Sequence, residues 1–256
     1  MKCSIIITNY NGERYINDCI ESLISQSYKN FEIIFYDDCS TDNSVKLIKE
    51  YKNIKILINK KKGKHPNFNQ INGIKKCFKV SSGEVIFFLD SDDFFKKKKI
   101  EKILYNFKDN SNLIFDLPII FSKKKTKFKK KINLSPFPEM TSTSCLSMRR
   151  NVLKDILNKI AKDRYYNTWF DFRSAVYAKY MLKNYKVLND HLTFYRIRND
   201  SVTNKFSYLG ISWWERRLEY HLYLKWFLKK NNIKYKNNFD YIITKIFCHL
   251  IKLFKY

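Results

Sequence analysis

The 256-residue sequence has no long hydrophobic run. Its apolar stretches are short, such as residues 85–89, whereas a membrane-spanning helix needs about 20 such residues. We therefore expect no transmembrane helix. The three isoleucines at 5–7 are too few for the core of a secretory signal, and no small-residue cleavage site follows them. These absences predict a cytoplasmic protein.

The six cysteines include no C-x-x-C pair, and most of them lie among apolar residues. Neither a disulfide framework nor a zinc site is indicated, so we expect reduced thiols packed in a core. The sequence also has no visible internal repeat. With 45% apolar residues over this length, it predicts one folded domain or two closely fused halves.

Acidic residues are scarce in the second part of the sequence. Residues 1–93 carry 14 Lys and Arg against 12 Asp and Glu, whereas residues 94–256 carry 36 against 12. A coding bias toward Lys, Asn and Ile explains part of the net charge of +26, but a uniform bias would not divide the chain so sharply. We expect the basic part to face an anionic partner: a membrane surface, a lipid phosphate or nucleic acid.

Short apolar runs alternate with helical patterns over the first 118 residues. Near-continuous apolar strands separated by helices specify an α/β fold, with a mostly parallel sheet covered on both faces. Ligands bind at the carboxyl ends of the strands in such sheets. The expected strands are residues 3–8, 31–36, 54–58, 85–89 and 113–117.

The pattern changes after Pro118. A lysine-rich stretch at 122–131 predicts an exposed loop or hairpin tip. Two C-terminal helices are expected, the first over 208–228 and the second from the apolar stripe at 239–254. Between them and the lysine-rich stretch we expect a strand at 141–148, helices at 151–161 and 170–182, and a strand at 192–196.

Three carboxylates follow the expected strand at 85–89, in the run Asp90, Ser91, Asp92 and Asp93. Carboxylates placed together in a partly closed site repel one another, and a cation offsets that repulsion. Their oxygens suit Mg²⁺ or Mn²⁺ bridging to substrate phosphates. Taken alone, the motif also fits a solvated helix start that is neutralised by the lysines at 96–99.

A second acidic run decides between these interpretations. Residues 37–44 read Asp-Asp-Cys-Ser-Thr-Asp-Asn-Ser and follow another expected strand. Together with Ile-Thr-Asn-Tyr-Asn at 7–11, the run at 22–28, Ser-Gly-Glu at 82–84 and Leu-Asp-Ser-Asp-Asp at 89–93, this chain resembles the inverting family-2 glycosyltransferases of GT-A fold. The resemblance covers about residues 3–104 and implies nucleotide-sugar binding.

The resemblance also implies roles for individual residues. Thr8, Tyr10 and Asp38 match family positions that hold the base and ribose of the nucleotide. Asp90 and Asp92 match the Asp-x-Asp that meets the ribose and the diphosphate-bound Mg²⁺ or Mn²⁺, and Ser91 between them is expected in the donor site. An Asp can accept hydrogen bonds from a pyrimidine N3 proton or from ribose hydroxyls. Lys64 and Asn67 lie in a segment similar to rhamnosyltransferase-like members, and we expect them at the donor as well.

The second half is similar to the family at two places. Residues 168–171 resemble the segment that holds the catalytic base, and Asp171 is the carboxylate there. One carboxylate suffices for a general base, although a helix-capping or surface Asp is the alternative. Residues 192–202 resemble a Tyr-Arg-x-His stretch in which Arg198 takes the place of His. Arg198 can supply charge to phosphates but cannot ligate a metal ion.

These observations predict a metal-dependent inverting glycosyltransferase. It would move a hexose from a UDP- or dTDP-sugar to a hydroxyl of a bacterial surface glycan or its polyprenyl-diphosphate-linked precursor. We expect a nucleotide-sugar-binding half at 1–118, an acceptor-binding half at 119–206 and a helical extension at 207–256. The alternatives are a sugar-1-phosphate nucleotidyltransferase, which lacks support because no Gly-rich basic loop follows the first strand, and a nucleic-acid-binding protein, which the near-neutral first half disfavours.

The stripe at 239–254 raises one further expectation. With Lys245, Lys252 and Lys255 beside it, the segment has the form of an interfacial helix that meets an anionic membrane. A helix packed on the body, with its lysines in solvent, is the alternative. On the first interpretation the protein would be peripheral at the cytoplasmic face of the membrane.

Overall fold

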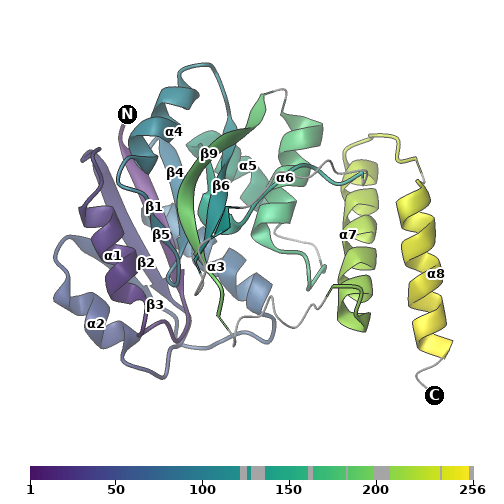
Figure 1. Cartoon of the computed structure of the whole chain (residues 1–256), viewed down its shortest axis with the longest axis horizontal. Coiled ribbons are helices and arrows are strands. Elements are labelled where there is room, and N and C mark those ends of the chain that lie inside the picture. The colour runs from purple at the N-terminus through teal and green to yellow at the C-terminus, as the bar shows by residue number, and fades with distance from the viewer. Residues whose placement is uncertain are drawn as a thin grey trace.

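A computed structural model describes residues 1–121, 136–160, 164–182, 184–198, 208–236 and 238–253, together with the backbone of 126–127. Figure 1 shows a sheet flanked by helices, with two antiparallel helices side by side at one edge of the molecule. Within these residues, no helix is both long and apolar enough to cross a membrane.

Four parallel strands form the first part of the sheet. Their order is β3-β2-β1-β4, with Cys3 of the central strand β1 opposite both Phe31 and Val85. The β-branched run at 5–7 is fully buried in β1, as expected for a strand covered on both faces. The strands are β1 (Cys3–Asn9), β2 (Phe31–Asp37), β3 (Ile54–Ile58) and β4 (Val85–Asp90).

The second part of the chain continues the same sheet. The order β4-β8-β6-β9-β5 contains antiparallel pairs and one parallel pair, β6 with β9. Strand β6 runs across residue 118, the boundary expected between the two halves, so both halves share one sheet. The strands are β5 (Phe94–Phe95), β6 (Leu113–Phe121), β7 (Thr126–Lys127), β8 (Leu146–Arg149) and β9 (Tyr185–Arg196).

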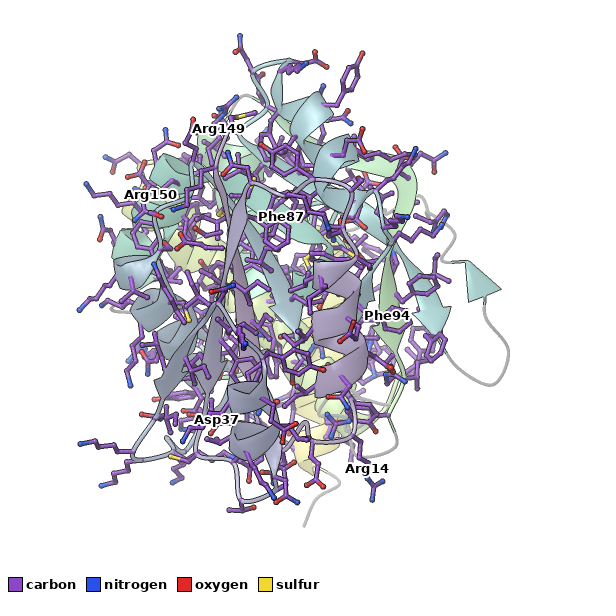
Figure 2. The ribbon with its side chains drawn as sticks, turned by 90° about the vertical axis from the view of Figure 1, so that its left-hand side faces the viewer. Arg14, Asp37, Phe87, Phe94, Arg149 and Arg150 are labelled. Atoms are coloured by element: carbon purple, nitrogen blue, oxygen red, sulfur yellow. The ribbon has the colours of Figure 1, made fainter. Side chains whose placement is uncertain are left out.

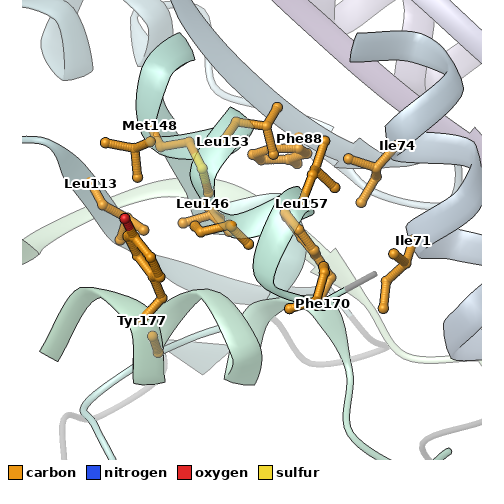
Figure 3. Close-up of a cluster of buried hydrophobic side chains, with 14 of the residues drawn as sticks. Ile71, Ile74, Phe88, Leu113, Leu146, Met148, Leu153, Leu157, Phe170 and Tyr177 are labelled. Carbon is orange, nitrogen blue, oxygen red and sulfur yellow. The ribbon is translucent and has the colours of Figure 1, made fainter. Parts of the chain in front are cut away.

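Helices cover both faces of the sheet and form two apolar clusters. One face packs against α1 (Ile16–Ile24), α2 (Ser44–Glu50) and α4 (Lys99–Phe107). The other packs against α3 (Pro66–Val80), α5 (Arg150–Ile160), α6 (Phe170–Met181) and α7 (Ile211–Lys230). Figure 3 shows part of this second cluster, where Phe88 of β4 lies among Ile74, Leu153 and Phe170.

The last helix, α8 (Phe239–Leu253), packs against α7 and ends the described chain. Only Thr244 and Cys248 of its residues are buried. Both helices lie close to their expected ranges.

Most expected elements are present, with three differences. The strand expected at 141–148 begins at Leu146, because Thr143–Cys145 forms a 3-10 turn, η1. Strand β9 begins at Tyr185 rather than 192, and the short strand β5 was not expected. Most of the lysine-rich segment 122–131 lies outside the described residues, although the backbone of β7 pairs antiparallel with Ile119 and Ile120 of β6.

Candidate active site

A pocket of about 850 Å³ opens at the carboxyl ends of β1, β2 and β4. Figure 2 shows this end of the sheet at the lower edge, marked by Asp37, with Arg149 and Arg150 at the opposite end. The pocket lining combines residues from both parts of the chain. They include Thr8, Tyr10, Asp38, Lys62, Gln70, Asp90, Ser91, Asp92, Trp169, Asp171, Tyr195, Arg198, Arg216 and Tyr220.

Asp90 lies at the end of β4, where it accepts two hydrogen bonds. Its Oδ1 atom accepts from Thr8 Oγ1 at 2.8 Å and from Gln70 Nε2 at 3.0 Å. Burial, and next the negative charge of Asp92, raise the pKa of Asp90 to about 7. A cation beside this carboxylate would favour its ionised form.

The next two carboxylates are held by the end of β9 and the residues after it. Arg198 Nη1 lies 3.3 Å from Asp92 Oδ2, and the backbone N–H of Arg196 donates to Asp93 Oδ1 at 2.8 Å. Burial raises the pKa of Asp92, against the lowering effect of Arg198. Asp93 is 1% exposed, so its carboxylate is buried behind the pocket and does not line it.

The turn after β2 is built around Asp37. Its Oδ1 accepts from Asn9 Nδ2 at 2.8 Å, and its Oδ2 accepts from the backbone N–H of Ser40 at 2.9 Å. The turn passes through Cys39, whose φ of 58° lies in the left-handed region. Asp38 thereby faces the pocket, and Asn59 Nδ2 donates to its Oδ1 at 2.9 Å.

Asp171 lies in the first turn of α6 and lines the same pocket as the strand ends. The backbone N–H of Phe172 donates to its Oδ1 at 2.7 Å. Burial raises the pKa of Asp171 to about 6, whereas the hydrogen bond from Phe172 and, next, the positive charge of Arg216 oppose this rise. The charge of Asp171 in turn raises the pKa of Asp90, which is consistent with two carboxylates facing one pocket.

Buried polar side chains hold the loop before Asp171 in place. Arg173 is fully buried, and its Nε and Nη2 atoms donate to the backbone oxygens of Thr168 and Tyr165. Asn67 donates from Nδ2 to the same two oxygens at 3.2 and 3.1 Å. These contacts fix the backbone that leads into α6.

Seven of the expected site residues other than Asp171 line the pocket, and two do not. Lys64 and Asn67 are absent from the lining, because Lys64 is exposed and Asn67 is turned toward the 165–168 loop. Lys62 lines the pocket instead, with its Nζ 2.9 Å from the centre of the Tyr10 ring. The lining residues are Thr8, Tyr10, Asp38, Asp90, Ser91, Asp92 and Arg198.

Sequence reasoning missed Gln70, Arg216 and Tyr220. Gln70 lies one turn into α3, after the segment around Asn67 that resembles the family. Arg216 and Tyr220 lie one turn apart on α7, which carries no motif. Amphipathic spacing placed these helices but could not show which polar side chain faces a ligand.

Asp90 and Asp92 are the two carboxylates of the strand-end motif that could hold a cation. No group of three or more His, Cys, Asp or Glu in the described ranges is arranged to hold a metal ion. Mg²⁺ is commonly bound through one or two carboxylates together with substrate phosphates and water. Asp90 and Asp92 fit that kind of site, and Gln70 Oε1 beside Asp90 has no hydrogen-bond partner within the described chain.

Comparison with known proteins agrees with this geometry. The family model "Glycosyl transferase family 2" matches residues 4–162, which is more than half of the chain and includes all the strand ends of the pocket. The chain belongs to glycosyltransferase family 2.

Two relatives in this family extend the match. A glycosyltransferase from a Nostoc species, alr2836, is 31% identical over 223 residues, which is 77% of this chain and 65% of that protein. The Escherichia coli enzyme WfaP, named as a UDP-Glc:alpha-D-GlcNAc-diphosphoundecaprenol beta-1,3-glucosyltransferase, is 31% identical over 224 residues, or 80% of this chain and 82% of that protein. The chain thus spans just under two thirds of the Nostoc relative.

Among solved structures, Staphylococcus aureus TarS in complex with UDP-GlcNAc superimposes with a TM-score of 0.61. The two share 21% sequence identity, and the match covers 87% of this chain and 66% of that one. The similarity confirms the GT-A-like α/β fold expected from the sequence, with C-terminal helices.

Proposed function

We propose that this protein is a metal-dependent inverting glycosyltransferase that moves a hexose from a UDP- or dTDP-sugar to a hydroxyl group. The observation that carries the proposal is one pocket in which Asp171 faces the strand-end residues Asp38, Asp90 and Asp92. One wall suits a nucleotide diphosphate and the other carries a base. Family membership removes support from the two alternatives, a nucleotidyltransferase and a nucleic-acid-binding protein.

The donor would bind to the half formed by residues 1–118. Asp38 can accept a hydrogen bond from a pyrimidine N3 proton or a ribose hydroxyl, with Thr8 and Ser91 beside it. Tyr10 is 43% exposed and, with Lys62 against its ring, offers a flat surface at the pocket rim. The UDP-GlcNAc bound by TarS and the UDP-Glc in the name of WfaP support a uridine donor.

Asp90 and Asp92 would hold Mg²⁺ or Mn²⁺ together with the donor phosphates. The ion, when bound, stabilises negative charge that develops on the diphosphate. Arg198 would supply a second positive charge there, as a hydrogen-bond donor rather than as a metal ligand. Lys64 and Asn67 are left out of the proposed donor contacts because neither lines the pocket.

Asp171 would act as the general base from the 119–206 half. Its carboxylate accepts the proton of the acceptor hydroxyl, whose oxygen bonds to the anomeric carbon from the face opposite the nucleotide. The bond between that carbon and the diphosphate oxygen breaks, and the nucleoside diphosphate leaves with the electron pair. A pKa of about 6 keeps Asp171 ionised at neutral pH yet more basic than an exposed Asp.

The acceptor would be a bacterial surface glycan or its polyprenyl-diphosphate-linked precursor. The support is the acceptor in the name of WfaP and the basic second part of the chain, which suits a phosphate-bearing acceptor. On this proposal the protein works at the cytoplasmic face of the membrane, and residues 207–256 form the helical extension beside the acceptor half.

The test combines ligand binding with one substitution. A thermal-shift panel of nucleotide-sugars with and without Mn²⁺ should identify the donor, because a ligand of the native state raises its stability. Asp171→Asn should lower transfer ~10²-fold or more and leave donor affinity near wild type. Asp155→Asn, on α5 outside the pocket, is the matched control. Wild-type transfer in Asp171→Asn would overturn the role of the base.

A further inference from the structure

Among the residues that the structure describes, helix α8 is covered on one side only. On that side Trp214 of α7 stacks on Phe247 with ring centres 4.5 Å apart, and Cys248 Sγ donates to the Trp214 carbonyl. Arg217 Nε donates to Asp240 Oδ1 at 3.1 Å, which ties the beginning of α8 to α7. These contacts fix which face of α8 points away from the molecule.

The outward face of α8 is apolar. Large side chains recur on it at helical spacing, with exposed fractions from 41% at Leu250 to 77% at Phe239. Single exposed apolar residues are ordinary, but a continuous stripe along a whole helix marks an interaction surface. We name these residues the α8 stripe: Phe239, Ile242, Ile246, Leu250 and Leu253.

Positive charge borders the α8 stripe. Lys245 and Lys252 are exposed and lie two turns apart along one edge of the helix, and Lys234 and Lys236 are exposed in the segment before it. Residues 208–253 carry nine Lys and Arg against three Asp and Glu. The one acidic residue of α8, Asp240, is engaged by Arg217 rather than facing outward.

We propose that the α8 stripe docks onto an anionic lipid bilayer. An amphipathic helix of this form lies in the plane of the interface, with its apolar face at the boundary between headgroups and acyl chains. Its lysines then meet lipid phosphates, whose attraction adds to apolar burial. A second copy of the chain is a poorer occupant, because a self-complementary contact would bring the basic edges of both copies together.

Docking would bring the pocket to the membrane surface. Helix α7, on which α8 rests, also contributes Arg216 and Tyr220 to the pocket lining. The benefit of this position rests on the proposed function: an acceptor carried on a membrane lipid would have a short path to Asp171. The docking itself does not depend on catalysis and can be measured without substrate.

Vesicle co-sedimentation of the full chain tests the proposal. Vesicles of phosphatidylcholine alone are compared with vesicles that also contain phosphatidylglycerol, at low and high salt. The triple variant Ile242→Gln, Ile246→Gln and Leu250→Gln changes only exposed side chains, so it should fold and should bind anionic vesicles at least ~10-fold more weakly. The matched control is Ile58→Gln, Val80→Gln and Tyr105→Gln, which are exposed in the first half.

Replacing two lysines of α8 measures the electrostatic contribution to vesicle binding. Lys245→Gln with Lys252→Gln should weaken binding by about 5-fold per lysine, and added salt should remove most of that difference. The control pair, Lys46→Gln with Lys49→Gln, removes the same charge from exposed positions of α2. It should bind like wild type.

Three results would overturn docking. They are equal binding to neutral and anionic vesicles, wild-type binding by the triple variant, and a wild-type dimer that the triple variant dissociates, seen by analytical ultracentrifugation without vesicle binding. The thermal shift with nucleotide-sugar is measured on the same samples. Intact donor stabilisation beside failed sedimentation would refute docking and leave the proposed transferase activity standing.

Discussion

At the scale of single residues, the chemistry depends on the protonation of Asp171. A base must be ionised to accept a proton, and the pKa of Asp171 is raised to about 6. We expect kcat to fall about tenfold per pH unit below 6 and to level off above it. Arg216→Gln removes the positive charge that lowers this pKa, so the midpoint should move to higher pH. A profile that stays flat down to pH 5 would point to another base.

The raised pKa of Asp90 leads to a separate prediction, about the stability of the fold. Its pKa is raised to about 7 in the folded protein, above its ordinary value of 3.8, so folding favours the protonated form. The contribution of Asp90 to the free energy of unfolding is therefore fully present below about pH 4 and is lost as pH rises through 7. Asp90→Asn should raise the unfolding temperature at pH 8 by a few degrees and change it little at pH 4.

The matched control for Asp90→Asn is Asp109→Asn. Asp109 is exposed and pairs with Lys186 at the surface, where an ion pair contributes little. Its removal should leave the unfolding temperature nearly unchanged at both pH values. An unfolding temperature of Asp90→Asn below that of wild type at pH 8 would show that the ionised carboxylate is compensated in the unliganded protein.

At the scale of elements, a buried ion pair joins four segments beneath the pocket. Lys99 of α4 and Asp116 of β6 are fully buried with Nζ and Oδ1 2.8 Å apart. Lys99 Nζ also donates to the carbonyl of Ser144 in η1, and Thr193 Oγ1 of β9 donates to Asp116 Oδ2. The pair therefore fixes the second part of the sheet against α4.

Breaking this pair should be costly. Lys99→Met leaves the Asp116 carboxylate buried without its cation, and we expect a loss of about 3–5 kcal/mol in the free energy of unfolding, measured by urea denaturation. The double variant Lys99→Met, Asp116→Leu should recover much of that loss, because no charge remains uncompensated. A single variant within 1 kcal/mol of wild type would mean that water reaches the carboxylate.

The elements predicted correctly are those that carry their own signal. Strand β1 is a β-branched apolar run, and α8 has a regular apolar stripe, so local pattern suffices for both. Strand β5 has no such signal: Phe94 pairs with Phe194, a contact that sequence pattern cannot foresee. The turn η1 interrupts an expected strand because Ser144 turns to accept a hydrogen bond from the Asp90 backbone.

The same division applies to the candidate site. The positions of Thr8, Asp38 and Asp90 in the pocket lining could be predicted because they lie at or just after the ends of buried strands, within a recognisable motif. Asp116 could not, because it stands inside the apolar strand β6 and its partner Lys99 lies in a lysine-rich run that reads as solvent-exposed. Whether a charged side chain is buried depends on its partner, and that partner is known only from the fold.

At the scale of the whole molecule, one sheet connects the two parts of the chain that we propose bind the donor and the acceptor. Hydrogen-bonded neighbours run without interruption from β3 to β5, and β6 crosses the boundary between the halves. A hinge between them would have to break this ladder, so we expect donor binding to move side chains and loops only. Small-angle scattering should give the same radius of gyration with and without UDP and Mn²⁺. A clear decrease on binding would contradict this expectation.

The hydrogen bond between Asp93 and Arg196 also has a consequence for folding during synthesis. The backbone N–H that donates to Asp93 Oδ1 comes 103 residues later in the chain, and the edge of β4 stays unpaired until β8 is made. On the ribosome, the amino-terminal strands therefore emerge with an open sheet edge and a cluster of like charges, several seconds before their partners are translated. A nascent chain stopped near residue 120 should need a chaperone, whereas one that extends past Arg196 has the groups to close its own sheet.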